Sequence, residues 1–130
     1  MANIAFTATS TQTKMVHQDK TVIFDNVITN VGGAYNNSTG VFTAPQDGTY
    51  MIQATIRASH GEEIWANLSV NKSRVVSVNA RGTDGRHGMG SQSMVVTLGK
   101  GDIVTIECKN ENGNFYGHYY ETFSGYFMFK

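Results

Sequence analysis

The sequence predicts an all-β protein, an antiparallel sandwich or jelly roll of about eight to ten short strands. Apolar residues recur at every second position in several segments, which is the period of a strand that buries one face. Clusters of glycine and polar residues separate these segments at short intervals, as turns do. Almost no segment has the period of an amphipathic helix. These observations together favour strands joined by tight turns.

The expected strands follow from this alternation. The clearest are Tyr50–Arg57, Ile64–Asn71, Gln92–Leu98, Ile103–Cys108 and Phe123–Lys130, and the shorter ones are Ile4–Thr9, Val22–Phe24, Gly40–Thr43 and Arg74–Val78. Glycine-rich or polar turns should separate them, the longest being Arg81–Gly90 and Lys109–Gly117. Cys108 shares a face with the apolar residues of its strand, so we expect its side chain to be buried and unpaired.

Several strands are apolar on the second face as well. Tyr126 and Met128 alternate with Phe127 and Phe129, which we expect to face the core. Other apolar residues on second faces are Met51, Trp65, Val95 and Ile103. A surface strand of a sandwich normally alternates apolar and polar residues. Single exposed hydrophobic side chains are common, but their repetition over several strands predicts an oligomer interface that contains Tyr126 and Met128.

Length, charge and apolar content restrict the class of protein. The chain has 130 residues, which fits one domain, expected to span residues 4–130 after a lead-in of residues 1–3. Ten basic residues balance ten acidic residues, so the chain lacks the basic footprint of a nucleic-acid-binding protein. No apolar run approaches the roughly 20 residues of a membrane-spanning helix, and we expect no membrane span.

Evidence on the cellular compartment is divided. The first residues lack the basic and apolar regions of a signal peptide, so the chain is either cytosolic or a mature domain cut from a longer precursor. Cys108 is the single cysteine, which excludes an internal disulfide and mildly favours a reducing compartment. Four glycosylation sequons, at Asn36, Asn37, Asn67 and Asn71, slightly favour secretion.

Four stretches share their order and spacing with a known domain family. They are VIFDNVITN (22–30), YNNSTGVFTAPQDGTYMI (35–52), LGKGDIVTI (98–106) and FSGYFMF (123–129). Together they resemble the globular-head (C1q) domain, in the superfamily that includes tumour necrosis factor. The main matched positions are Phe6, Phe24, Tyr35, Gly40, Phe42, Gly48, Tyr50, Gly101, Asp102, Phe123 and Gly125. The resemblance implies a ten-stranded antiparallel jelly roll that assembles as a trimer, in a secreted protein.

The matched residues are explained by folding alone. Gly40 and Gly48 suit turns whose backbone geometry is strained for other residues. Phe24, Phe42 and Tyr50 are large core fillers, each costing roughly 3–5 kcal/mol of stability if truncated to alanine when buried. We therefore interpret the stretch from Tyr35 to Tyr50 as a signature of the fold.

Motifs for catalysis are absent from the sequence. It has no G-x-S-x-G nucleophile elbow, no phosphate-binding glycine loop and no H-E-x-x-H zinc motif. The four histidines, His17, His60, His87 and His118, lie far apart, and none has a partner at ligand spacing. We therefore expect a protein that is not an enzyme and needs no cofactor.

Calcium is the metal that the resemblance to the C1q family suggests. Some members of the family bind calcium near the trimer apex through acidic residues before and within a D-Q-A-S-G-like segment. The corresponding segment here, Gly88–Ser93, has no aspartate. Asp84, Glu62 and Glu63 are the candidate ligands that remain, but calcium takes about six to eight oxygen atoms, several of them from carboxylates. We therefore favour solvated carboxylates without a bound metal.

The segment Lys109–Glu121 is the strongest candidate for a ligand surface. It contains Asn114, Tyr116, His118 and Tyr119 among further amides and carboxylates. Aromatic faces beside planar polar groups suit a sugar, because its C–H face stacks and its hydroxyls need hydrogen-bond partners. The alternative is that the tyrosines of this segment pack within the trimer.

Three classes of function fit these features. The first is a secreted, lectin-like pattern-recognition protein of innate immunity that binds microbial carbohydrate as a homotrimer. The second is a signalling or scaffold ligand, hormone-like or synaptic, that binds a protein receptor. The third is a purely structural trimeriser. A glycan array separates the first two classes.

Overall fold

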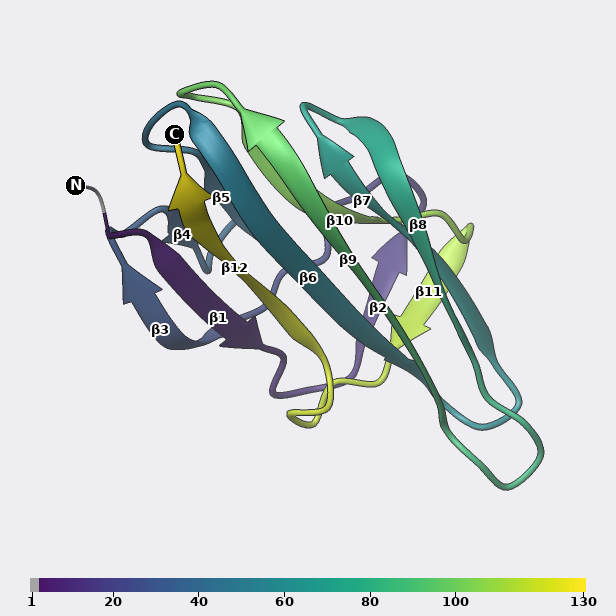
Figure 1. The fold of residues 1–130 in the computed structure, drawn as a ribbon. Coiled ribbons are helices and arrows are strands. Elements are labelled where there is room, and N and C mark those ends of the chain that lie inside the picture. The colour runs from purple at the N-terminus through teal and green to yellow at the C-terminus, as the bar shows by residue number, and fades with distance from the viewer. Residues whose placement is uncertain (1–2) are drawn as a thin grey trace.

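The chain folds into a sandwich of two β-sheets (Figure 1). This computed structural model describes residues 3–130, and residues 1 and 2 of the expected lead-in lie outside that range. The strands are β1 (Ala5–Thr9), β2 (Lys14–His17), β3 (Asn26–Val31), β4 (Tyr35–Asn36), β5 (Val41–Thr43), β6 (Gly48–Ala58), β7 (Glu63–Val70), β8 (Ser73–Arg81), β9 (Gly88–Leu98), β10 (Ile103–Cys108), β11 (Asn112–Phe115) and β12 (Thr122–Phe129).

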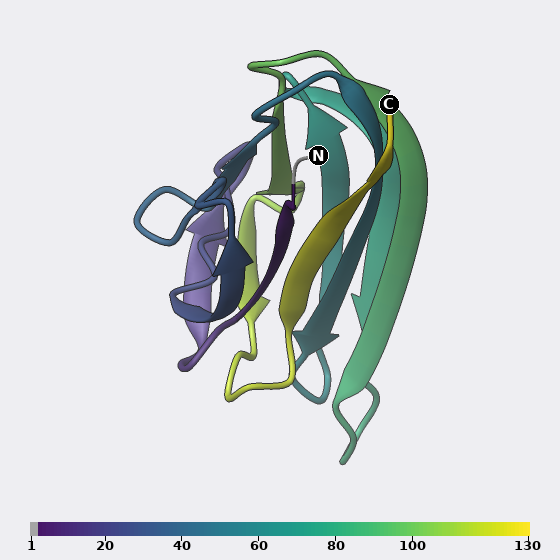
Figure 2. The ribbon, with the colours of Figure 1, turned by 60° about the vertical axis from the view of Figure 1, so that its left-hand side comes forward.

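The two sheets differ in size. One has seven strands in the order β2-β11-β6-β12-β1-β3, with β9 paired to β6 on the side away from β12. The other has five strands in the order β4-β5-β10-β7-β8. The described strand pairs are all antiparallel, which confirms the predicted sandwich. Figure 1 looks onto β3, β1, β12, β6 and β9 side by side, and Figure 2 shows the layers from the side.

The strand inventory departs from the expected one in detail. The described residues form twelve strands, and four of them were not expected: β3, with six residues, and β2, β4 and β11, with two to four residues. The expected strand Val22–Phe24 is not one. Instead Thr21 makes an isolated bridge to Glu107, and the Val22 amide donates to the Ile106 carbonyl at 2.7 Å. This segment therefore runs beside β10 without forming a ladder of its own.

Aromatic rings fill the core between the sheets. Phe6 stacks on Tyr35 at 5.1 Å and on Phe42 at 4.9 Å between ring centroids, and it meets the edge of Phe123 at 4.9 Å. These rings are buried, so the hydroxyl of Tyr35 needs a partner, which it finds in the Phe24 carbonyl at 2.8 Å. The core thus joins residues from the first, second and last quarters of the chain.

Glycine at two matched positions is required by the backbone. Gly40 has φ of 76°, and a Cβ there would lie 2.6 Å from the Val22 carbonyl oxygen. Gly101 has φ of 91° and precedes Asp102, whose carboxylate accepts the Gly99 amide at 2.8 Å. A hydrogen bond from Asn71 is the main cause that lowers the pKa of Asp102. Gly40 therefore serves a turn, as predicted. The prediction for Gly48 is wrong, because Gly48 begins β6 without a positive φ, and a Cβ there would instead overlap the Phe127 ring.

The glycine-rich stretch from Arg81 to Gly90 has a second role beyond forming a turn. β8 continues to Arg81 and β9 already begins at Gly88, whereas the expected strands ended at Val78 and began at Gln92. A Cβ at Gly90 would overlap the carbonyl oxygen of Asn79 on β8. Since β8 and β9 belong to different sheets, these glycines let the two sheets meet closely along one edge.

The last strand and Cys108 test the predicted faces. Phe123 and Gly125 face the core, but Phe129 is mostly exposed, contrary to the prediction. A register shift between Phe127 and Phe129 against β6 explains this, because it ends the alternation. Cys108 is buried and unpaired as predicted, and burial raises the pKa of its thiol.

Candidate functional site

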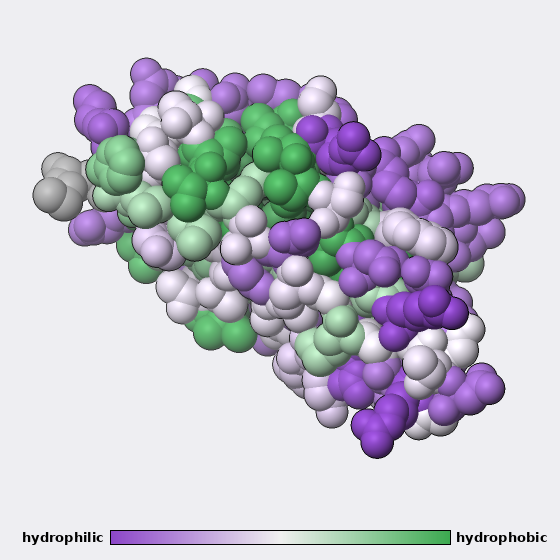
Figure 3. Space-filling view, turned by 45° about the vertical axis from the view of Figure 1, so that its right-hand side comes forward, coloured by the Kyte–Doolittle hydropathy of each residue, from purple (hydrophilic) through white to green (hydrophobic). Residues whose placement is uncertain are grey.

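An apolar row crosses the outer face of the seven-stranded sheet. Tyr126 on β12 lies opposite Met51 on β6, and Met51 lies opposite Val95 on β9. On the other side of β12, Ala5 and Val31 extend the same row across β1 and β3. Tyr126 is 48% exposed, and Val31 and Val95 are also exposed. Figure 3 shows hydrophobic side chains gathered on one face of the molecule.

The same face becomes polar one row further on. Ser124, Gln53 and Ser93 lie opposite one another on β12, β6 and β9. The Gln53 Oε1 accepts the hydroxyl of Ser124 at 3.0 Å and that of Thr122 at 3.2 Å. The apolar row is therefore bounded on this side, and the face divides into an apolar half and a polar half.

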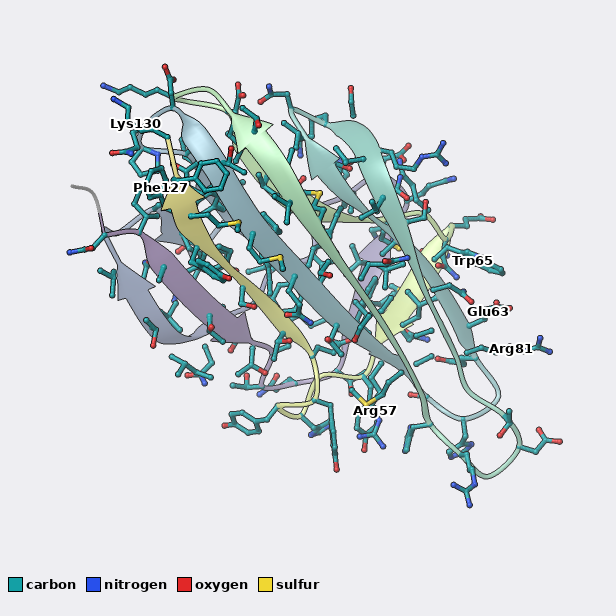
Figure 4. All side chains as sticks on the ribbon, viewed as in Figure 1. Arg57, Glu63, Trp65, Arg81, Phe127 and Lys130 are labelled. Atoms are coloured by element: carbon teal, nitrogen blue, oxygen red, sulfur yellow. The ribbon has the colours of Figure 1, made fainter. Side chains whose placement is uncertain are left out.

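Three loops meet at the far end of the sandwich, away from the two termini (Figure 1). Together with the end of β6, they place six side chains close to one another, named here the loop cluster: Arg57, His60, His87, Tyr116, His118 and Tyr120. The Arg57 guanidinium lies 3.6 Å from the centroid of the Tyr120 ring and 5.0 Å from that of Tyr116. Figure 4 shows Arg57 at this end of β6. Cation–π attraction therefore joins β6 to the β11–β12 loop.

The histidines of the loop cluster surround one tyrosine. The Tyr116 ring lies 4.2 Å from the His87 ring and 4.8 Å from the His118 ring, measured between centroids. His60 lies 5.4 Å from His87. Three of the four histidines of the chain thus meet in space, although they are far apart in the sequence. The Nδ1 of His87 is buried and has no hydrogen-bond partner among the described residues.

Glu121 lies fully buried under this end of the molecule. Its Oε2 accepts the backbone amide of Arg57 at 2.8 Å, and its backbone carbonyl accepts the Thr9 hydroxyl. Its Oε1 has no partner among residues 3–130. Desolvation raises the pKa of this carboxyl to about 7, and the charge of Lys14 acts in the opposite direction. Glu121 is therefore a buried carboxyl with a pKa near neutral pH, and it links the end of the β11–β12 loop to β6.

The four predicted ligand residues lie on or beside the loop cluster. Asn114, on β11, donates its side-chain amide to Glu62 Oε1 at 3.2 Å. Tyr116 is half-buried within the cluster, and His118 is exposed on its margin. Tyr119 is 66% exposed, and both His118 and Tyr119 have positive φ angles, of 50° and 68°. The turn thus points the Tyr119 ring toward solvent, while Tyr116 is partly covered by its neighbours.

The three candidate metal ligands line one pocket. This acidic pocket, of about 410 Å³, is formed by Gly61, Glu62, Glu63, Arg81, Gly82, Thr83 and Asp84. Glu63 accepts a hydrogen bond from Asn79 at 3.1 Å, and it lies directly opposite Arg81 across β7 and β8. Within residues 3–130, no three His, Cys, Asp or Glu side chains are arranged to hold a metal ion. The pocket nonetheless gathers carboxylates and a guanidinium beside the loop cluster.

Comparison with known proteins identifies the family. The model of the C1q domain family matches residues 5–128, nearly the whole chain. The chain belongs to the C1q domain family. It is 32% identical over 130 residues to complement C1q tumor necrosis factor-related protein 3 of Mus musculus, covering 98% of this chain and 52% of that protein. The C1q domain described here therefore spans about half the length of this curated relative.

Solved structures show the same fold. The globular domain of zebrafish complement 1qA superimposes with a TM-score of 0.83 at 21% identity, covering 98% of each chain. The tumour necrosis factor Eiger of S. frugiperda superimposes with a TM-score of 0.81 at 10% identity, covering 98% of this chain and 94% of that one. The C1q domain is non-catalytic, so the prediction that the chain is not an enzyme is confirmed. Residues 3–130 contain no helix long and apolar enough to cross a membrane.

Arg57 and Glu121 are residues of this C1q domain that sequence reasoning did not single out. Arg57 stands on the outer face of its strand at the end of a regular alternation, and nothing local shows that it meets Tyr116 and Tyr120. Glu121 lay within the segment Lys109–Glu121, but its burial follows from contacts with residues more than 60 positions away. The available signal for Glu121 was a carboxylate directly after two tyrosines.

Proposed function

We propose that this C1q domain is a secreted recognition protein that forms a homotrimer and binds microbial carbohydrate with its far end. Two separate surfaces support the proposal. The apolar row supplies a face suited to self-association, and the loop cluster with the acidic pocket supplies a polar and aromatic surface. Exposed sequons at Asn36, Asn37 and Asn71 are compatible with passage through the secretory pathway.

The trimer part rests on the apolar row. The exposed Tyr126 and Val95, with the half-buried Met51 between them, favour association, because their burial removes apolar area from water. A stable protein–protein interface buries about 1,200–2,000 Å² in total, and we expect the trimer contacts to bury an area of this order. Sedimentation equilibrium should give about three times the chain mass of 14.2 kDa. A monomer at micromolar concentration would contradict this part of the proposal.

The carbohydrate part rests on the loop cluster adjoining the acidic pocket. His60 of the cluster directly precedes Gly61 of the pocket, and the hydrogen bond from Asn114 to Glu62 joins β11 to the same pocket. Tyr119 and Tyr120 offer exposed rings on which the C–H face of a sugar can stack. The carboxylates and Arg81 offer the planar acceptors and donors that sugar hydroxyls require.

Binding at one such site should be weak, and the trimer should compensate. A few stacking and hydrogen-bond contacts must offset desolvation of hydroxyls and amides. Three linked sites raise the apparent affinity on a repeating surface through effective concentration, without new contacts. We therefore expect binding to whole microbial cells that far exceeds binding to free monosaccharide.

The test compares Tyr119→Ala and Tyr116→Ala with the wild type on a glycan array and on microbial cells. Each ring is worth roughly 0.5–1.5 kcal/mol beyond its buried area, so single-site binding should fall several-fold. Ile28→Ala, which removes an exposed apolar side chain on β3, is the matched control. Unchanged binding in both tyrosine variants would exclude the loop. The absence of binding to any glycan on the array, together with tight binding of one protein partner, would instead support a signalling or scaffold ligand.

A further inference from the structure

Trp65 stands apart from the apolar row. It is the single tryptophan of the chain, and it is 50% exposed. Its strand β7 belongs to the five-stranded sheet, whereas the apolar row lies on the seven-stranded sheet. Figure 4 shows Trp65 projecting outward on the same side as Glu63 and Arg81. Self-association through the apolar row therefore leaves this indole uncovered.

A groove lies beside the Trp65 side chain. The Trp65 groove has a volume of about 620 Å³ and is lined by Trp65, Ala66, Asn67, Arg74, Ser77 and Lys109. Asn67 lies opposite Ser77 on the neighbouring strand and accepts its hydroxyl at 3.2 Å, so two short polar side chains form part of the lining. Asn67 is only 8% exposed although it lies on the outer face. The volume is within the range of about 300–1,000 Å³ that is common for ligand pockets.

The charges around the Trp65 groove leave one cation unpaired. Lys109 pairs with Asp19 at 2.6 Å, and Lys72 pairs with the buried Glu107 at 3.1 Å. Among residues 3–130, Arg74 has no ion-pair partner and no hydrogen bond from its guanidinium. The hydrogen bond that Lys109 donates to Asp19 is the main cause that raises the pKa of Lys109, and the nearby charge of Arg74 acts against it. Arg74 thus adds an unneutralised positive charge to the groove.

The groove therefore combines three recognition elements. The indole offers a flat apolar face, the Arg74 guanidinium offers a planar pair of donors for an oxyanion, and the amide of Asn67 and the hydroxyl of Ser77 offer polar partners between them. A neutral sugar would use the first and third elements and leave the guanidinium unused. An acidic saccharide would use all three.

We propose that the Trp65 groove binds an acidic saccharide, with one ring stacked on Trp65 and a carboxylate or sulfate paired with Arg74. This site is separate from the loop cluster and the acidic pocket, which carry the proposed carbohydrate function. Each subunit of a trimer assembled through the apolar row would present one open groove on its other sheet.

The single tryptophan makes the test direct. Because Trp65 is the single source of indole fluorescence, its emission reports occupation of the groove. The probes are 3′-sialyllactose, which carries a carboxylate, 3′-sulfated lactose and neutral lactose. We expect the acidic probes to change the emission in a saturable way and lactose to leave it unchanged. The comparison of carboxylate with sulfate separates the two chemical sources of the anion.

Charge-matched variants decide whether the groove is specific. Arg74→Gln should weaken binding of the acidic probe about threefold to tenfold, since a partly exposed charge-assisted pair is lost. Arg86→Gln removes the same charge from the exposed β8–β9 loop and should have no effect. Equal weakening by both variants, or unchanged emission with either acidic probe at millimolar concentration, would overturn the proposal. Tyr119→Ala should leave the Trp65 signal intact, so the two sites can fail independently.

Discussion

The outer faces of the two sheets differ although their strands show the same kind of alternation. On the seven-stranded sheet, Tyr126, Met51 and Val95 stand side by side and form a continuous apolar row. On the five-stranded sheet, Trp65 is flanked by polar neighbours such as Asn79 and by the groove. An apolar residue on a second face therefore has two meanings. We propose that it marks self-association where neighbouring strands repeat it, and a ligand surface where it stands alone among polar groups.

The largest expected effect separates the two faces by charge. Tyr126→Glu places a carboxylate within the apolar row, where burial of an unpaired ion should cost about 3 kcal/mol or more per subunit. Sedimentation equilibrium should then show the 14.2 kDa monomer at concentrations where we expect the wild type to be trimeric. Val75→Glu makes the same change at an exposed valine on β8 of the other sheet and should leave the trimer intact. Dissociation by Val75→Glu alone would mean that the two faces have been assigned the wrong way round.

The next effect concerns the edge where the two sheets meet. Gly90→Ala should destabilise the fold by about 3 kcal/mol, since the added methyl group overlaps the Asn79 carbonyl oxygen and only the backbone can move away. Gly85→Ala is the control, because a Cβ there meets no atom within 4 Å. Alanine at Gly85 should cost only about 1 kcal/mol, which comes from its positive φ of 81°. Urea unfolding measures both, and equal losses would show that the close approach of β8 and β9 contributes little.

These two predictions also mark the limit of what the sequence could show. Alternation is a local property, so β6, β7, β10 and the start of β12 were predictable from their own residues. Which sheet a strand joins depends on long-range pairing, and for that reason Trp65 and Tyr126 could be assigned to a second face but not to different sheets. Gly88 and Gly90 resembled a turn because their partner strand is not visible locally.

The loop cluster was hidden from the sequence for the same reason. Tyr116, His118 and Tyr119 were predicted as site residues because aromatic and polar groups were adjacent along the chain. The contacts of Tyr116 with Arg57 and His87 depend on loops that converge only in the folded sandwich. The short pairing of β11 with β2 illustrates the difficulty, since Asn112 lies opposite His17 from the other end of the chain.

Glu121 predicts how stability at this end depends on pH. Its pKa is raised from 4.5 to about 7 in the folded state, so the unfolded chain binds fewer protons between these values. The contribution of Glu121 to the free energy of unfolding should therefore be greatest below about pH 4.5, and it should be lost as the pH rises to about 7. The shift corresponds to a loss of roughly 3 kcal/mol, as an order of magnitude.

Glu121→Gln isolates this contribution from that of the histidines and Arg57 nearby. The amide keeps an acceptor for the Arg57 backbone N–H but cannot ionise. The difference in unfolding free energy between the variant and the wild type, measured by urea titration from pH 4.5 to 8, should grow with pH in favour of the variant. A difference that stays constant over this range would show that the pKa of Glu121 is the same in the folded and unfolded states.

The smallest effect is expected at Cys108, which lies where β10 meets β2 and β11 of the other sheet. Its Sγ approaches the Val16 carbonyl at 3.4 Å, and its side chain is fully buried. Burial favours the neutral thiol, so a disulfide reagent should react slowly with the native protein and rapidly after unfolding in urea. Cys108→Ala should cost only about 1 kcal/mol, since it removes one small buried group. Gly90→Ala should accelerate labelling of Cys108 only through its effect on global stability. The reason is that Gly90 lies where β8 meets β9, whereas Cys108 lies where β10 meets β2 and β11. Complete labelling of the native wild type would show that the junction at Cys108 opens independently of the rest of the sandwich.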